Sequence, residues 1–172
     1  MKRSSIQPMP KYFDRYINLI DDVELDEAFE TSLQELATFD RAAYRALGLQ
    51  TYAPGKWTVP DILQHLIDWE RIMTYRALVF AREVSKQAPG HDENQMALTA
   101  GASARSIDEL IDEMVALRKS TRYFFRTLNT VQLQQSGICW ESEMSALALG
   151  FTILGHQKHH FELLKARYLP LV

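Results

Sequence analysis

GHQKHHFE, residues 155–162, stands in the middle of a long apolar segment that runs from Met144 to Leu169. Three of the five histidines in the chain, His156, His159 and His160, fall within five consecutive positions here. Residues four apart on a helix lie one above the other on the same face, so His156 and His160 can direct two imidazoles to a single point. This spacing predicts that a divalent metal ion occupies that point.

Two ligands from one helix make an incomplete site, because a catalytic zinc centre has three protein ligands and one open position. His65 is the candidate for the third ligand. It lies in the apolar stripe of a second predicted helix, three residues after Ile62 and four before Trp69, so its ring should face inward. Helical bundles build metal sites from side chains on facing helices. We therefore predict a metal site made of His65, His156 and His160.

Other roles are open for each of these histidines. An inward imidazole without a partner costs about 1 to 3 kcal/mol, so a hydrogen bond to a neighbouring side chain or water is the alternative to a metal. His159 is a rival ligand, because it shares a face with His156 at three-residue spacing, and it could instead support the site from outside. His91 follows a Pro-Gly pair and is expected to be a loop residue.

The composition is that of a globular protein, with 47% hydrophobic and 24% charged residues among 172. A net charge of −3 gives no electrostatic reason to expect nucleic acid or an anionic membrane as a partner. Cys139 is the only cysteine, so an intrachain disulfide is excluded. No secretory pattern follows the basic start, and the longest apolar stretch is shorter than a membrane span of about 20 residues. A cytoplasmic protein is expected.

Helical periodicity dominates the chain and predicts an all-α fold. An N-terminal arm (1–22) with a short helix should precede a bundle (23–170), the whole forming one domain (1–172). Helices of about 23 to 26 residues are 35 to 39 Å long and match one another, which favours a four-helix bundle. Residues 93–104 read as a connection with a helical turn. The four long helices are expected at about 25–48, 59–84, 106–128 and 145–169.

Several segments, taken in order, resemble the DinB-like (DinB/YfiT) superfamily: KWTV (56–59), QHLIDWE (64–70), YRAL (75–78), PGHD (89–92), GHQKHH (155–160) and RYL (167–169). The resemblance extends from about Val23 to Leu169. It implies a four-helix bundle in which three histidines hold a divalent metal, namely His65, His156 and His160. His91 departs from the aromatic residue more usual before the loop aspartate.

The resemblance also implies a range of activities. Zinc, nickel and iron all suit imidazole ligands, and the bound metal could activate a water or a low-molecular-weight thiol. A metal-dependent thiol S-transferase or a hydrolase acting on a small-molecule substrate is therefore expected. The alternatives are a non-catalytic binding module in which the metal staples two helices, and a plain helical scaffold. Homodimerisation through an exposed helical face is compatible with the pattern.

Other polar residues could support the metal. Arg76 lies eleven residues after His65 and so returns to nearly the same helical face, while Asp92 could orient a ligand or a water. A buried ion pair between Arg76 and Asp92 is the competing interpretation. Glu70 is predicted on a solvated face of its helix. Cys139, which precedes a tryptophan and has no basic neighbour, is predicted to be a buried thiol rather than a nucleophile.

Overall fold

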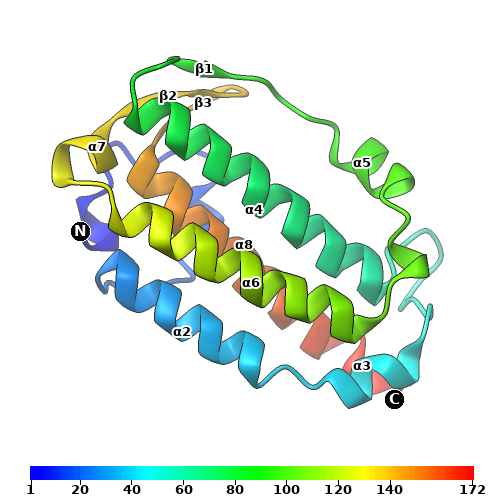
Figure 1. Cartoon of the computed structure of the whole chain (residues 1–172). Helices are drawn as coiled ribbons and strands as arrows, with labels where there is room; N and C mark the ends of the chain where they lie inside the picture. The colour runs from blue at the N-terminus through cyan, green and yellow to red at the C-terminus, as the bar shows by residue number, and fades with distance from the viewer.

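The computed structural model describes residues 1–172 and contains four long helices packed as a bundle, with a small sheet at one end (Figure 1). The predicted four-helix bundle is confirmed. The all-α fold class is confirmed as well, and three short strands that the sequence did not predict are added to it. The bundle helices are α2 (Leu25–Ala37), α4 (Val59–Ala81), α6 (Ile107–Arg126) and α8 (Ala146–Arg167).

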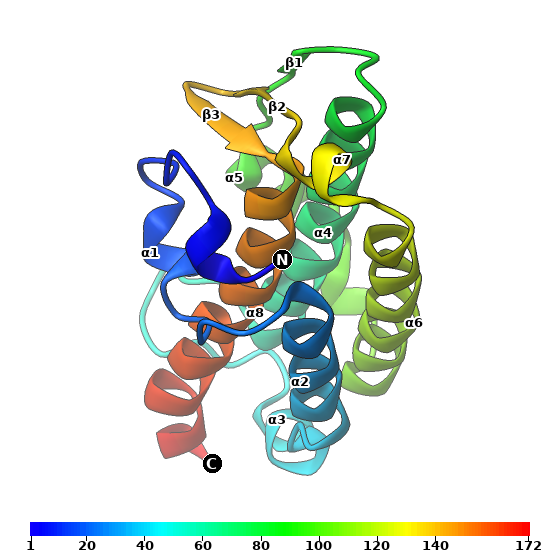
Figure 2. The same cartoon turned by 90° about the vertical axis from the view of Figure 1, so that its left-hand side faces the viewer.

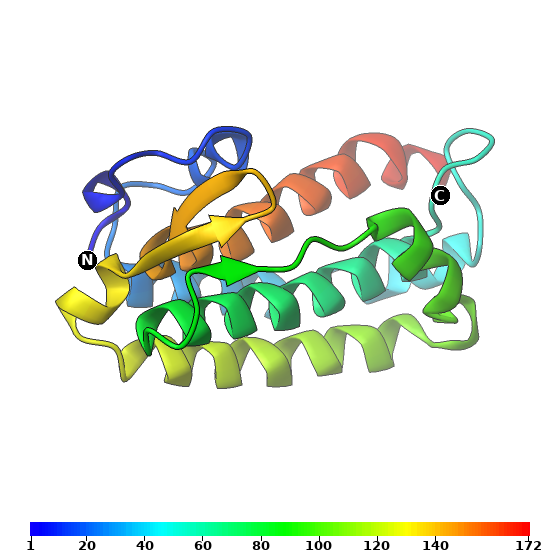
Figure 3. The ribbon, with the colours of Figure 1, turned by 90° about the horizontal axis from the view of Figure 1, so that it is seen from above.

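Each bundle helix packs against two others. α4 packs against α6 and α8, and α2 packs against the same two helices, so α4 and α8 are neighbours in the ring. Figure 1 shows that α4 and α6 run in the same direction. The connection between them, residues 82–106, must therefore travel back along the bundle, and Figure 3 shows it passing beside α4. This path brings a long loop close to the helices that carry the histidines.

Capping boxes fix where two of the four bundle helices begin. The hydroxyl of Thr58 accepts a hydrogen bond from the backbone N–H of Asp61 at 3.3 Å, and the Asp61 carboxylate accepts one from the N–H of Thr58 at 2.9 Å. Ser106 and Glu109 form the same pair of bonds at the start of α6. Each box satisfies backbone donors that a helix start leaves free.

The first predicted bundle helix is divided, and the prediction of one helix over 25–48 is wrong. α2 ends at Ala37, and α3 (Arg41–Leu47) begins after a three-residue break. Asp40 starts the second helix because its carboxylate accepts a hydrogen bond from the N–H of Ala43 at 3.0 Å. The apolar spacing continues across the break, so periodicity alone gave no sign of it.

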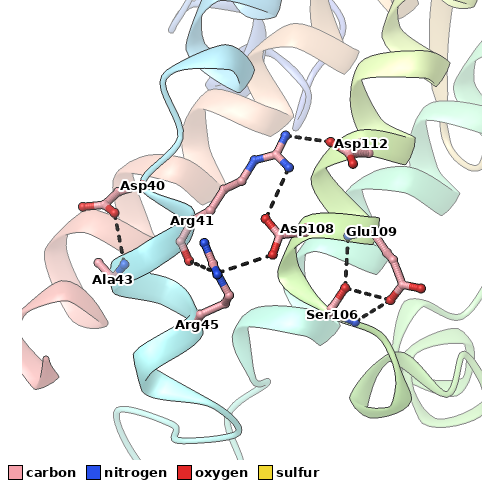
Figure 4. A network of polar contacts seen from close by, with 8 residues as sticks. All are labelled: Asp40, Arg41, Ala43, Arg45, Ser106, Asp108, Glu109 and Asp112. Atoms are coloured by element: carbon pink, nitrogen blue, oxygen red, sulfur yellow. Dashed lines mark hydrogen bonds and ion pairs between the residues drawn. The ribbon is translucent and has the colours of Figure 1, made fainter.

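Ion pairs attach α3 to the first turns of α6 (Figure 4). The guanidinium of Arg41 donates to Asp112 at 2.8 Å and to Asp108 at 3.4 Å. Arg45 lies 3.4 Å from the other carboxylate oxygen of Asp108. These contacts hold the short helix at the end of the bundle away from the sheet.

The N-terminal arm lies against α8 (Figure 2). The short helix predicted in the arm is α1 (Asp14–Ile17). The close approach depends on Gly155, where an added Cβ would lie 2.0 Å from the carbonyl oxygen of Tyr16. A glycine directly before His156 therefore lets the arm cover the histidine-bearing helix.

α8 is the central helix of the fold. All its residues from Ala146 to Gln157 are buried, because α2, α4, α1 and the strands surround it. The sequence predicted only one buried stripe here.

No helix in the structure has both the length and the apolar character that crossing a bilayer requires.

The unpredicted sheet joins the two long connections of the chain. β1 (Gln87–Ala88) pairs in parallel with β2 (Ser136–Cys139), which pairs antiparallel with β3 (Ser142–Ser145). These strands are too short for a period-two pattern to be recognised. Further along the first connection, the predicted helical turn is found as α5 (Glu93–Thr99), and α7 (Thr130–Gln134) precedes β2.

Candidate metal centre

The structure brings His65 from α4 together with His156 and His160 from α8. The Nε2 atom of His156 lies 3.1 Å from Nε2 of His65 and 3.1 Å from Nε2 of His160. One nitrogen from each ring lies within 4.8 Å of the others, and no other group of three or more potential ligands is found in the chain. His65 and His156 are each only 6% exposed.

Hydrogen bonding among the three rings cannot satisfy all of them. A neutral imidazole nitrogen carries either one proton or one lone pair, so Nε2 of His156 can pair with His65 or with His160 but not with both. A cation placed among the three nitrogens accepts a lone pair from each. The donor set therefore fits a divalent metal better than it fits a hydrogen-bonded core.

The two distances from Nε2 of His156 also fit a small metal ion. Zinc binds histidine nitrogen at about 2.0 to 2.1 Å, and at tetrahedral corners this separates neighbouring nitrogens by about 3.3 Å. The two distances from His156 differ from that value by a few tenths of an ångström. Three histidines fill three corners and leave the fourth for another ligand.

Burial keeps the three imidazoles neutral. It lowers the pKa of His65 from 6.5 to about 4 and that of His160 to about 3. Burial also lowers the pKa of His156 well below 6.5, and the neighbouring His160 and His65 add to the effect. A metal competes with protons for these nitrogens, so neutral rings are ready to bind it at neutral pH.

Aromatic rings surround the three histidines. The ring of Trp57 lies 4.8 Å from that of His65, and Tyr16 makes an edge contact of 5.1 Å with His156. The Nδ1 atom of His160 is buried without a hydrogen-bond partner in the protein. Aromatic packing thus helps to hold the rings of His65 and His156 in position, and no hydrogen bond within the protein fixes Nδ1 of His160.

The two remaining histidines lie outside the cluster. His159 is exposed and contacts the rings of His160 and Tyr16 at 5.1 and 5.3 Å. The contact with His160 places His159 beside the cluster rather than within it. His91 is an exposed loop residue, as predicted.

The predicted ion pair between Arg76 and Asp92 is wrong. Arg76 is buried, but it donates to the carbonyl of Pro89 at 2.7 Å and makes no ion pair with Asp92. The carboxylate of Asp92 instead accepts hydrogen bonds from the N–H groups of Asn94 and Gln95, which start α5. Arg76 therefore holds the loop that precedes α5, and Asp92 starts that helix.

The prediction that Glu70 is solvated is wrong. Its side chain is buried, and its two carboxylate oxygens accept hydrogen bonds of 2.9 to 3.1 Å from the buried Arg118 of α6. Arg118 also donates to the hydroxyl of Ser32 at 2.6 Å. The sequence indicated one buried face of α4, the face that carries His65. In the fold, α4 packs against α8 and also against α6, so a second face that includes Glu70 is buried as well.

The thiol of Cys139 is buried, as predicted. Burial raises its pKa to about 11, and the nearby Arg76 offsets only part of that effect. A thiol with this pKa stays protonated at neutral pH, so it is a poor nucleophile and a poor metal ligand.

Two pockets reach the histidine cluster from different sides. The larger, of about 490 Å³, is lined by His156, by Asp92 and by five aromatic residues: Tyr12, Phe13, Tyr16, Trp69 and Trp140. The smaller, of about 230 Å³, is lined by His160, Lys56 and Trp57 among others. A small molecule could therefore reach the cluster from the larger pocket, at His156, or from the smaller pocket, at His160.

Sequence reasoning missed the contribution of the arm and the β2–β3 turn to this site. The only sign of this contribution in the sequence is the four-residue spacing of Tyr12 and Tyr16, which predicts that the two rings lie on one face of the arm. Nothing in the sequence placed that face against His156, because the contact depends on the fold.

Comparison with known proteins agrees with this architecture. A family model described as the DinB superfamily matches residues 13–164. The structure is similar to that of YfiT from Bacillus subtilis, described as a probable metal-dependent hydrolase with an unusual four-helix bundle topology. The TM-score is 0.63 at 18% sequence identity, over 94% of this chain and 90% of that chain, which shows a shared fold. No curated protein matches the sequence.

Proposed function

Because the chain belongs to the DinB superfamily and gathers three buried histidines at one point, we propose that it is a metal-dependent enzyme acting on a small molecule. The metal would be held by His65, His156 and His160. Hydrolysis is the reaction that the comparison with YfiT supports, since that protein is described as a probable metal-dependent hydrolase.

The observation that carries this proposal is the meeting of three imidazole nitrogens beside open pockets. A divalent ion held by three histidines lowers the pKa of a water or thiol in its open position toward neutrality. His156 and His160 each line a pocket, so a ligand in that position would have access to substrate. A purely structural metal site instead closes its coordination with protein atoms.

The residues of the chain would keep the donor set fixed and neutral. α8 presents His156 and His160 on consecutive turns, and α4 presents His65 to the same point. The rings of Trp57 and Tyr16 restrict the rotation of the imidazoles they contact. Pre-positioned ligands of this kind need little rearrangement when the metal binds.

Thiol transfer is the second candidate, and one observation favours it. A transfer reaction requires two substrates, and the cluster is open to two separate pockets. A low-molecular-weight thiol could approach through one pocket and its acceptor through the other. Zinc, nickel and iron remain equal candidates for the metal, because each is bound by imidazole.

The test is to load the purified chain with zinc, nickel or iron(II) and to assay hydrolysis of ester and amide panels. A parallel assay would offer thiols with electrophilic acceptors. Activity should require metal and fall at least a hundredfold in His65→Ala and His160→Ala. His159→Ala is the matched control, because His159 neighbours the cluster without belonging to it, and it should retain activity.

A different result would support the metal-staple alternative. In that case the chain would bind one metal ion per molecule and lose it on His65→Ala substitution. The bound ion would nevertheless accept no exogenous ligand, and no substrate in either panel would be turned over.

A further inference from the structure

The larger pocket beside His156 is lined mainly by aromatic side chains. Tyr12, Phe13 and Tyr16 come from the N-terminal arm, Trp69 from α4, and Trp140 from the β2–β3 turn. Its volume of about 490 Å³ lies in the range of about 300 to 1,000 Å³ that is usual for small-molecule sites. Segments far apart in the sequence thus supply rings to one cavity.

Two of these rings stand at the outer part of the pocket on strained backbone. Tyr12 is 46% exposed with φ of 72°, and Trp140 is 60% exposed with φ of 56°. Only one other non-glycine residue in the chain, Glu83, has a positive φ. Large side chains rarely adopt this conformation, and residues that do adopt it cluster at functional sites.

The strained residues contact each other. The rings of Tyr12 and Trp140 meet edge to face at a centroid distance of 5.8 Å. The arm and the turn that carry them are otherwise joined by a hydrogen bond from the Ser142 hydroxyl to the carbonyl of Lys11. Exposed aromatic rings held beside a cavity offer faces and edges against which another ring can pack.

The charges around the pocket narrow the choice of ligand. Asp92 and Glu93 line it, whereas no lysine or arginine does. Two arginines lie beside lining rings, and both are already engaged. Arg15 rests on the rings of Tyr12 and Tyr16 and donates to the Tyr16 hydroxyl at 3.0 Å. Arg76 lies 5.5 Å from the centre of the Trp69 ring and donates to the carbonyl of Pro89. A negatively charged group at the end of the pocket away from the metal would meet two carboxylates without a lining lysine or arginine to balance it.

We propose that this pocket binds an uncharged aromatic ring of the substrate, with the reacting group next to it at the histidine cluster. The inference rests on the proposed function, because it assumes a metal at His156 that accepts a ligand. It adds the substrate class, namely an aryl compound whose reactive carbonyl or equivalent group is attached to the ring.

Hydroxamates test the substrate class without a catalytic assay, because their two oxygens bind an exposed metal ion. Zinc-loaded protein would be titrated calorimetrically with acetohydroxamate, which carries only a methyl group, and with benzohydroxamate. We expect benzohydroxamate to bind at least tenfold more tightly. A 4-carboxybenzohydroxamate should lose most of that advantage to the carboxylates of Asp92 and Glu93.

Variants at the strained positions assign the preference to this pocket. Tyr12→Gly and Trp140→Gly remove a ring while suiting a positive φ, so they should reduce the preference for benzohydroxamate at least threefold. Their affinity for acetohydroxamate should not change. Tyr75→Ala is the matched control, because Tyr75 is an exposed aromatic residue of α4 outside the pocket, and the preference should persist.

The outcomes separate this inference from the proposed function. Equal affinity for the two simple hydroxamates, or a preference unchanged by both glycine variants, would overturn the aromatic pocket and leave the open metal site standing. Tight binding of the 4-carboxy compound would overturn the uncharged class. If acetohydroxamate itself failed to bind zinc-loaded protein, the open coordination position would be refuted, and the substrate class with it.

Discussion

The Nε2 atoms of His65 and His156 lie 3.1 Å apart although 91 positions separate the two residues in the chain. The contact exists only when α4 and α8 are packed together, so a metal that bridges these nitrogens binds the folded chain and not the unfolded one. By mass action, free metal at a hundredfold excess over its dissociation constant stabilises the fold by about 2.7 kcal/mol.

Metal should therefore raise the thermal midpoint of the wild-type chain in a concentration-dependent way. The same titration should leave the midpoints of His65→Ala and His160→Ala almost unchanged, as measured by differential scanning calorimetry. His159→Ala should respond like wild type. A midpoint that rises equally in all four proteins would mean that the metal binds somewhere else.

The metal-free chain should lose stability as the pH falls below 6.5. The unfolded chain takes up protons on its histidines near pH 6.5, whereas in the folded chain the pKa is lowered to about 4 at His65 and about 3 at His160. Between these values the unfolded state binds more protons, so the free energy of unfolding decreases by about 1.4 kcal/mol per pH unit for each such histidine.

Urea unfolding of metal-free protein between pH 7.5 and 4.5 measures this slope. In His65→Gln the slope between pH 6 and 4.5 should be smaller by about 1.4 kcal/mol per pH unit, because one buried imidazole has been removed. Identical slopes in the two proteins would show that His65 is not held neutral by burial.

Breaking the buried pair of Glu70 and Arg118 should destabilise the fold strongly. Glu70→Gln leaves the arginine charge buried without its carboxylate, at a cost of about 3 to 5 kcal/mol. The double variant Glu70→Leu with Arg118→Met removes both charges and should recover most of that loss. Denaturant unfolding of Glu70→Leu, Arg118→Met and the double variant checks this. A double variant that loses as much stability as the two single variants together would contradict it.

Gly155→Ala should destabilise the chain by about 1 to 3 kcal/mol, although alanine is the better helix former. The added Cβ would collide with the carbonyl of Tyr16 and push the arm away from His156. Gly150→Ala in the same helix is the control. There the new Cβ would meet only side chains, of Leu25 and Phe125, at 3.1 Å, and thermal unfolding should show a smaller loss.

The bundle and the histidine cluster could be anticipated because both follow from local periodicity. An i, i+4 pair fixes the relation of His156 to His160, and an apolar stripe points His65 inward. The three-residue break before α3 could not be anticipated, since the apolar spacing continues through it and only the cap at Asp40 marks it.

The parts that sequence reasoning missed depend on long-range contacts. The aromatic pocket is assembled from the arm, α4 and the β2–β3 turn, so no local pattern contains it. Glu70 was misplaced for the same reason, because its burial depends on where α6 lies. The expected pair of Arg76 with Asp92 failed because Pro89 offers a backbone acceptor nearer to the guanidinium.

X-ray absorption of the zinc-loaded chain shows whether the three histidines hold the metal and leave one position open to solvent. We expect one ion bound by three imidazole nitrogens at about 2.0 Å, with an oxygen ligand from solvent that is replaced when acetohydroxamate is added. In His65→Ala one imidazole contribution should disappear. A spectrum with four protein ligands that does not change with acetohydroxamate, or one without histidine scattering, would contradict the account.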